Sequence, residues 1–430
     1  MKIAFYTLGC KVNQYESVHL CTEFEKRGHE IVSHNEIADA YVINSCTVTA
    51  QSDSKSKKMV GHFRRQNEKA IIALIGCFPQ AFRDKAYAVK DADIVLGNAQ
   101  KSKVLDLVEE AFEDRQKVCA VKDFEKDATI EKMSITGFNE RTRAFVKIQD
   151  GCNRFCSYCI IPTARGRICS KPIDEIISEI TALSGNGYSE IVLVGIDLSS
   201  YGKEFNLSLV DAVEAVSKID GVKRIRLGSL EPEIITKDEL LRLSKVPEFC
   251  PQFHLSLQSG CDNTLKSMNR HYTCDEYKDI VKNIRSVFEN ATITTDVMVG
   301  FAGESEEDFL SSLNFVKDIG FLKVHVFPYS RRSGTRADKF TNHIDGETKK
   351  KRAKIMLCEV EKIRLQILEK EIGKIKEVLV ESRQKNGFCF GYTKEYLPVY
   401  IESCSAKVGE MCSVEITSVN ADGCVGRAIN

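Results

Sequence analysis

The sequence predicts an α/β protein in three parts: an N-terminal doubly wound parallel sheet, a central partial (β/α)6 barrel and a small C-terminal β-barrel. Three observations lead to this fold class. The chain has 430 residues, more than one hydrophobic core usually serves. Apolar runs alternate with helical periodicity over most of its length, which is typical of parallel sheets covered by helices. The last stretch has short strand-like runs separated by turns.

The composition limits where the protein works and what it binds. Its 17 cysteines are an odd number, and the start Met1-Lys2-Ile3-Ala4-Phe5 has a strand pattern instead of a signal peptide, so we expect a reducing, cytoplasmic environment. No apolar run is long enough to span a membrane. The 61 basic and 61 acidic residues balance, so any nucleic-acid site must be local.

The first domain, expected at residues 1–122, alternates strands with helices. Three of its strand runs end beside a cysteine: 3–8 before Cys10, 40–44 before Cys46 and 71–75 before Cys77. The carboxyl ends of parallel strands meet at one edge of the sheet, where ligands bind. These residues together therefore predict a site with three thiolates, although any one cysteine taken alone is better explained as a half-buried thiol.

The second domain, expected at residues 141–345, repeats a strand followed by a helix. Its strands are predicted at six apolar runs: 144–148, 191–195, 222–227, 253–257, 293–299 and 324–327. Six such repeats suit a partial barrel whose concave face opens at the strand ends. A charged helix at 346–374 then leads to the last domain, expected at 375–430. Its five short strands suggest a small barrel of a kind that often binds oligonucleotides.

Three cysteines follow the first strand of the central barrel: Cys152, Cys156 and Cys159, with the spacing Cys-x3-Cys-x2-Cys. A structural zinc normally takes four protein ligands, and the nearest further candidate is Cys169, ten residues beyond Cys159. A four-iron cluster held by three cysteines instead keeps one iron open for another molecule. The spacing therefore favours an iron–sulfur site over a zinc knuckle.

The same motif, with Tyr158 before its third cysteine, resembles the signature of radical S-adenosylmethionine (SAM) enzymes. This resemblance implies that Cys152, Cys156 and Cys159 hold a [4Fe-4S] cluster and that the methionine moiety of SAM chelates the open iron. It also implies SAM contacts at the ends of the barrel strands, where the matching residues are Gly195, Asp197, Ser256, Gln258, Asp296 and Gly300.

Together with the first domain, the resemblance narrows to the methylthiotransferases. It is carried by residues 8–17, 44–49, 76–80, 152–166 and 327–335, and residues 378–428 resemble the tRNA-binding TRAM module. The resemblance implies that Cys10, Cys46 and Cys77 hold a second [4Fe-4S] cluster. It further implies that one SAM methylates a sulfur attached to that cluster, and that a second yields the radical that activates C2 of an adenine.

Residues 9–17 and 259–262 resemble the subgroup that methylthiolates N6-threonylcarbamoyladenosine next to the anticodon of tRNA. Relatives acting on isopentenyladenosine in tRNA or on a ribosomal-protein aspartate share the six cysteines and remain alternatives, as does a non-catalytic metal- or RNA-binding protein. The expected partners are the tRNA anticodon stem-loop, an electron donor such as flavodoxin or ferredoxin, and a sulfur donor, with no membrane.

Recognition of tRNA is expected to rest on local basic and aromatic groups. Arg331 and Arg332 follow the last barrel strand and are the residues we expect near the modified base. The helix after Cys46 carries further candidates: Lys55, Lys57, Lys58, Arg64 and Arg65. The alternative for each of these residues is an ordinary solvated surface position.

Overall fold

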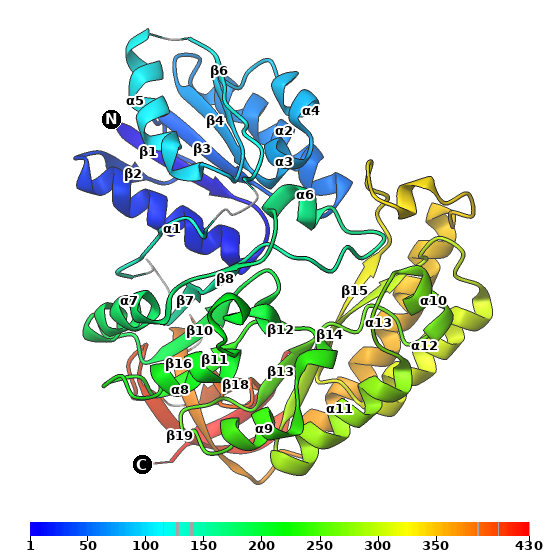
Figure 1. Cartoon of the computed structure of the whole chain (residues 1–430). Helices are drawn as coiled ribbons and strands as arrows, with labels where there is room; N and C mark the ends of the chain where they lie inside the picture. Colours follow the sequence, from blue (N-terminus) through cyan, green and yellow to red (C-terminus); the bar gives the residue numbers. More distant parts are fainter. Residues whose placement is uncertain (115, 126–128, 138–141, 385–386, 403, 430) are drawn as a thin grey trace.

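The computed structural model describes residues 1–114, 116–125, 129–137, 142–384, 387–402 and 404–429. The N-terminal sheet lies at one end of the molecule, the central barrel in the middle and the C-terminal β-barrel at the other end (Figure 1). The predicted α/β fold class is confirmed in all three parts. Within the described residues, no helix is both long and apolar enough to cross a membrane.

The N-terminal sheet consists of parallel strands in the order β2-β1-β3-β4-β5-β6. The strands are β1 (Lys2–Thr7), β2 (Glu30–Val32), β3 (Ala40–Ser45), β4 (Ile71–Gly76), β5 (Ile94–Leu96) and β6 (Val118–Cys119). The helices are α1 (Lys11–Lys26), α2 (Ala50–Gln66), α3 (Cys77–Ala81), α4 (Arg83–Tyr87) and α5 (Val104–Asp114). The short edge strands β2 and β6 were not predicted, because so few residues carry no recognisable period.

Helices cover both faces of this sheet, which explains the continuous apolar sequences of β3 and β4. Every residue of these two strands is buried. Val42 and Ala73 pack on the side of α1 and α5, whereas Ile43 and Leu74 pack with Phe63 of α2 on the opposite side. The register of the sheet is thus fixed from both faces.

The central barrel has two parallel sheets with the orders β11-β10-β7 and β12-β13-β14-β15. The strands are β7 (Arg143–Lys147), β10 (Glu190–Val194), β11 (Arg224–Leu227), β12 (Ser229–Leu230), β13 (Gln252–Leu255), β14 (Thr292–Val299) and β15 (Lys323–Pro328). A short pair, β8 (Gln149–Asp150) and β9 (Cys169–Ser170), flanks the cysteine motif. All six predicted strand runs contain a strand, and β12 is an addition that follows β11 after the single residue Gly228.

The helices outside the barrel are α6 (Ile161–Arg165), α7 (Ile173–Gly185), α8 (Leu209–Val216), α9 (Lys237–Leu243), α10 (Asp262–Ser267), α11 (Cys274–Val287) and α12 (Glu306–Ile319). Several start at a capping box, in which the cap hydroxyl and an acidic side chain three residues later satisfy each other's backbone N–H groups; the caps are Ser208, Thr236, Thr273 and Ser305. These caps fix the residues at which α8, α9, α11 and α12 begin.

Helix α13 (Gly346–Glu369) leads to a closed barrel with the strand order β16-β17-β18-β20-β19. Its strands are β16 (Ile375–Arg383), β17 (Cys389–Thr393), β18 (Pro398–Glu402), β19 (Met411–Val419) and β20 (Cys424–Ala428). Cys389, Cys404 and Cys424 are buried in the core of this barrel, and the partly buried Cys412 packs against that core.

The C-terminal barrel docks on the amino-terminal ends of the central strands. Arg224, the first residue of β11, donates to the carbonyls of Tyr392 (3.0 Å) and Glu377 (2.9 Å). Thr292, the first residue of β14, donates to the carbonyl of Glu395 at 2.5 Å. The cysteine motif follows the carboxyl end of β7, so the C-terminal barrel lies at the opposite end of the strands from this motif.

Candidate functional site

Cys10, Cys46 and Cys77 follow the carboxyl ends of β1, β3 and β4, which are neighbours in the N-terminal sheet. A tight approach brings the first two together at Gly9. A Cβ atom at this glycine would lie 2.8 Å from Cβ of Cys46 and 3.1 Å from its Sγ, and φ of Gly9 is +105°. The three cysteines therefore lie at the ends of neighbouring strands, as the sequence predicts. Only glycine fits at position 9, where the chain beside Cys10 approaches Cys46.

Cys152, Cys156 and Cys159 lie in the loop that follows β7 and β8. Gly151 has φ +71°, and a Cβ there would lie 1.8 Å from the carbonyl oxygen of Arg167, so this glycine lets the loop pass against residues 166–167. The loop is tied to the barrel at Ser157, whose N–H donates to the carbonyl of Met268 at 2.8 Å. The three thiols line a cavity of about 780 Å³, here named the cysteine cavity.

Three of these thiols, at Cys46, Cys152 and Cys159, stay protonated when no metal is bound. Burial raises the pKa of Cys152 and of Cys159 to about 12. Burial, together with the neighbouring Cys77, raises the pKa of Cys46 to about 11. A metal centre binds thiolates, so its binding must displace these protons.

The donor set fits a cluster better than a single ion. Among the described residues, no three His, Cys, Asp or Glu side chains converge closely enough to hold one metal ion. A four-iron cluster takes each cysteine on a different iron, so its ligands stand apart around a larger body. Three thiols around the cysteine cavity meet this requirement.

Buried charges surround the Cys152 set, and sequence reasoning did not identify most of them. Arg270 donates from Nη1 to Sγ of Cys156 at 3.3 Å and is ion-paired to Glu231. Asp197 lies with Oδ2 4.0 Å from Sγ of Cys152, and its Oδ1 is buried without a hydrogen-bond partner in the described structure. An unpartnered buried carboxylate oxygen beside the cysteine cavity suits a cationic ligand group.

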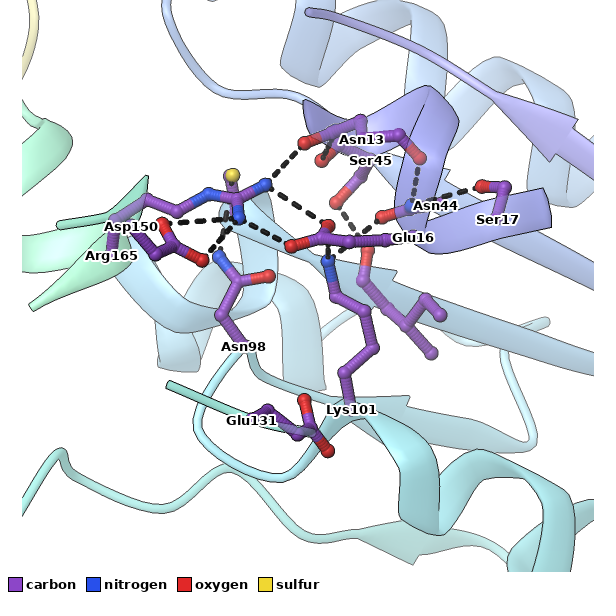
Figure 2. Close-up of polar contacts among 12 residues, drawn as sticks. Asn13, Glu16, Ser17, Asn44, Ser45, Asn98, Lys101, Glu131, Asp150 and Arg165 are labelled. Carbon is purple, nitrogen blue, oxygen red and sulfur yellow. Dashed lines mark hydrogen bonds and ion pairs between the residues drawn. The ribbon is translucent and has the colours of Figure 1, made fainter. Parts of the chain in front are cut away.

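A buried ionic network joins the two cysteine sets (Figure 2). Arg165 of α6 places Nη1 2.6 Å from Oε1 of Glu16 in α1 and 3.0 Å from Oδ2 of Asp150. Lys147 of β7 contacts the same two carboxylates at 3.0 and 2.9 Å, and Lys101 is ion-paired to Glu16. Burial would raise the pKa of Glu16, but Arg165, Lys101 and Lys147 together hold it well below its usual value.

The charges of this network also act on the thiols of the N-terminal cysteine set, in addition to joining the N-terminal domain to the central barrel. Three cations face two carboxylates, which leaves one positive charge in excess. Burial raises the pKa of Cys10, and the charge of Arg165 opposes that rise. Asn98 donates to Sγ of Cys77 at 3.3 Å and to the carbonyl of Ala164 at 2.7 Å, next to Arg165. The charge of Arg165 therefore offsets part of the effect of burial at Cys10, whose pKa nevertheless stays raised.

A second cavity of about 990 Å³, here named the barrel cleft, runs between all three parts of the chain. It begins at Cys10, follows the inner face of β13 to β15 and ends at the C-terminal barrel; its lining includes Lys11, His254, Asp296, His325, Phe327, Phe390, Tyr392 and Tyr400. Aromatic rings and polar groups in one cleft are the means by which proteins stack and read unpaired bases.

The predicted SAM residues occupy different surroundings. Gly195 approaches Gln149, whose Oε1 accepts from the N–H groups of Ile196 and Asp197 at 2.9 and 2.8 Å. The carbonyl of Ser256 accepts from the hydroxyl of Tyr272 at 2.7 Å.

The last three predicted SAM residues lie on or near β14. Gln258 has φ +63° and donates from its backbone to the carbonyl of Asp296 at 2.8 Å. Asp296 lines the barrel cleft, where its carboxylate lies 3.3 Å from Nε2 of His254. Gly300 donates to Glu304 at 2.6 Å.

The two predicted substrate arginines differ in availability. Arg332 is buried, with Nη2 2.6 Å from Asp53 and 2.8 Å from the hydroxyl of Thr47, so its guanidinium docks the N-terminal domain on the barrel. Arg331 has 58% of its side chain exposed and pairs with Asp338 at 2.5 Å. Of these two arginines, Arg331 is therefore the one whose guanidinium is exposed to solvent.

Comparisons with known proteins agree with this arrangement. Residues 146–316 match the Radical SAM superfamily, residues 2–97 match the Uncharacterized protein family UPF0004, and residues 369–426 match the TRAM domain. TsrM, a radical SAM methyltransferase from Kitasatospora setae, shares the fold with a TM-score of 0.54 and 11% identity, over 76% of this chain and 74% of that one. With three cysteines after the first barrel strand, these matches define a radical SAM enzyme.

Sequence relatives give the family. The threonylcarbamoyladenosine tRNA methylthiotransferase MtaB of Bacillus subtilis is 35% identical over 96% of this chain and 93% of its own length. MtaB of Aquifex aeolicus is 38% identical over 88% and 93%. The chain belongs to the tRNA methylthiotransferases of the MtaB type, and its cofactors are an iron–sulfur cluster and SAM.

Proposed function

We propose that this enzyme inserts a methylthio group at C2 of N6-threonylcarbamoyladenosine next to the anticodon of tRNA. The MtaB relatives in Bacillus subtilis, Aquifex aeolicus and Thermotoga maritima are named for this nucleoside and are 34% to 38% identical to the chain. A relative named tRNA-2-methylthio-N(6)-dimethylallyladenosine synthase, from Pelotomaculum thermopropionicum, is 32% identical. Such an activity belongs in the cytoplasm, where tRNA is modified.

We assign one [4Fe-4S] cluster to each set of three cysteines. The observation that carries this assignment is the pairing of the sets: Arg165 contacts Glu16 beside the Cys10 set, while the thiols of Cys152, Cys156 and Cys159 line the cavity that Arg165 also lines. The bound clusters and SAM supply the one-electron chemistry that an unreactive ring C–H requires and that side chains lack. Two clusters imply about eight irons per chain.

The protein's own groups hold and orient the reactants. We assign Asp197 to the amino group of SAM, because its buried Oδ1 has no partner among the described residues and its Oδ2 lies 4.0 Å from Sγ of Cys152. Gly195 shapes the same turn, and Ser256, Gln258, Asp296 and Gly300 remain proposed contacts at the strand ends.

The barrel cleft is the proposed entry for the tRNA base. It joins Cys10 to the aromatic side chains of the C-terminal barrel, so an unstacked base there reaches the N-terminal cysteine set. Arg331 lies just beyond Phe327 at the end of β15 and is the proposed contact to the nucleotide. An electron donor such as flavodoxin or ferredoxin and a sulfur donor complete the reaction.

The nucleoside can be tested with purified, anaerobically reconstituted enzyme. Two RNA stem-loops are compared that differ only in carrying N6-threonylcarbamoyladenosine or isopentenyladenosine. Mass spectrometry should find the methylthio product with the first substrate alone. Product with isopentenyladenosine alone would assign the chain to the other tRNA subgroup, and modification of a ribosomal protein with neither RNA modified would exclude a tRNA substrate.

A further inference from the structure

Helix α2 presents a basic face to solvent, formed by Lys55, Lys58, His62 and Arg65 with Lys57 on its flank and here named the α2 basic face. The first four residues are spaced by three, four and three positions, so they form one stripe along the helix. All of them are exposed, and they lie opposite the buried face of Ser56, Val60 and Phe63.

The charges of this face are not neutralised. The single acidic residue of α2 is Asp53, and its carboxylate lies 2.6 Å from Arg332. The charge of Arg64 is also paired, because its guanidinium lies 2.6 Å from the carboxylate of Asp93. Lys55, Lys57, Lys58 and Arg65 form no ion pair within the described parts of the chain. An ordinary solvated helix face mixes both signs of charge, whereas this one carries only one sign.

The α2 basic face is connected to the candidate site. Helix α2 begins shortly after Cys46, and the N–H of Ala50 donates to the hydroxyl of Ser330 at 3.2 Å. A cavity of about 450 Å³ lies at this contact, and its lining includes Lys57, Phe82, Lys85 and Arg331. Phe327, three residues before Ser330, lines the barrel cleft. Basic groups thus extend from the rim of the barrel cleft along α2.

We propose that the α2 basic face binds the phosphate backbone of the tRNA arm whose modified base enters the barrel cleft. This inference rests on the proposed tRNA substrate and adds the surface that positions it. The stripe from Lys55 to Arg65 is about 15 Å long at 1.5 Å per residue, so it can follow several nucleotides. Lysine and arginine contacts to phosphates fix position and register, whereas the cleft contacts the base.

An acidic electron-donor protein is the other partner that a basic face could attract. Electron transfer requires a donor to approach a cluster closely. The stripe instead runs away from Cys46 along the helix, and its groups line up in a single row. A row of cations leading away from the cleft matches a polyanionic strand better than a compact protein surface.

The test measures binding of a fluorescently labelled anticodon stem-loop RNA to the reconstituted full chain at several salt concentrations. The variant Lys58→Ala/Arg65→Ala removes two exposed cations, so the slope of log affinity against log salt should become less steep by about 1.4 to 1.8. Affinity at low salt should fall by about tenfold or more. Lys218→Ala/Lys282→Ala, which removes two exposed lysines of the central barrel, is the matched control and should bind like the wild type.

The outcomes separate this inference from the proposed function. If wild type and control bind the RNA with the same salt slope as Lys58→Ala/Arg65→Ala, the α2 assignment is wrong and the tRNA substrate stands. If wild type does not bind the RNA, the proposed function itself fails. If RNA binding is unchanged but reduction by flavodoxin becomes slower in the α2 variant, the face docks an electron donor and our assignment is overturned. Thermal unfolding of the variant checks that the fold is intact.

Discussion

Arg165 and Glu16 form a buried ion pair of 2.6 Å between two parts of the chain that are separated by 149 residues in sequence. Glu16 belongs to the first helix after Cys10, and Arg165 ends the helix after Cys159. Figure 2 shows the guanidinium between Glu16, Asp150 and Asn13. The two cysteine sets are therefore held in one fixed arrangement by buried charge contacts.

Replacing Arg165 by methionine should destabilise this arrangement strongly. Glu16 and Asp150 would lose a buried cation, and breaking a buried pair from one side typically costs about 3–5 kcal/mol of unfolding free energy. Denaturant unfolding of the apo-protein measures the change. Arg167→Met, at an exposed position two residues further on, is the control. Equal unfolding midpoints for the two variants would show that the network contributes nothing to stability.

Removing either cysteine set should halve the iron content, but the two variants should differ in activity. Alanine at Cys152, Cys156 and Cys159 should leave about four irons per chain and abolish reductive cleavage of SAM. Alanine at Cys10, Cys46 and Cys77 should also leave about four irons, but SAM cleavage should persist while methylthiolation stops. Iron analysis and detection of 5′-deoxyadenosine measure both effects. Loss of SAM cleavage in both variants would mean that the roles of the sets are assigned wrongly.

Asp197→Asn tests the proposed contact to SAM. The substitution keeps the size of the side chain but removes its charge, and a hydrogen bond to a charged group is typically worth about 1.5–3 kcal/mol. The dissociation constant for SAM should rise by about tenfold to hundredfold. Ser200→Ala, which removes the hydroxyl that donates to Asp197 at 2.9 Å, should have a smaller effect. An unchanged dissociation constant for Asp197→Asn would remove this residue from the SAM site.

The raised pKa of Cys152 predicts how the rate of its alkylation in the apo-protein changes with pH. Burial raises the pKa of Cys152 to about 12, so its thiolate fraction grows about tenfold per pH unit throughout the range from 7 to 10. Alkylation by iodoacetamide, followed for the Cys152 peptide by mass spectrometry, should accelerate accordingly without reaching a plateau. A plateau below pH 9 would show that the thiol ionises more readily than its burial implies.

The parts of the fold that depend on local sequence pattern could be predicted from the sequence. The apolar runs of β3 and β4 and the cysteines that follow them identify the sheet and its ligand edge, because strand period and strand-end position are local properties. Strands β2, β6 and β12 were missed because two or three residues carry too little pattern. These short strands are recognisable only by their pairing with β1, β5 and β13 in the folded structure.

Charge pairing across the fold was not accessible from sequence. Arg332 was expected at the substrate, yet its guanidinium contacts Asp53, which is 279 residues away in the chain. Arg270, which donates to Cys156, lies 114 residues from that cysteine. A sequence shows that these residues are charged, but only the packed structure shows which opposite charge each one meets.

The most direct test of the account is the nucleoside profile of tRNA. In cells that lack this enzyme, mass spectrometry of bulk tRNA should find N6-threonylcarbamoyladenosine without its methylthio group. The wild-type gene should restore the group, and a Cys46→Ala gene should not, because that cysteine belongs to the set assigned to sulfur insertion. A profile that is unchanged by loss of the enzyme would contradict the proposed function.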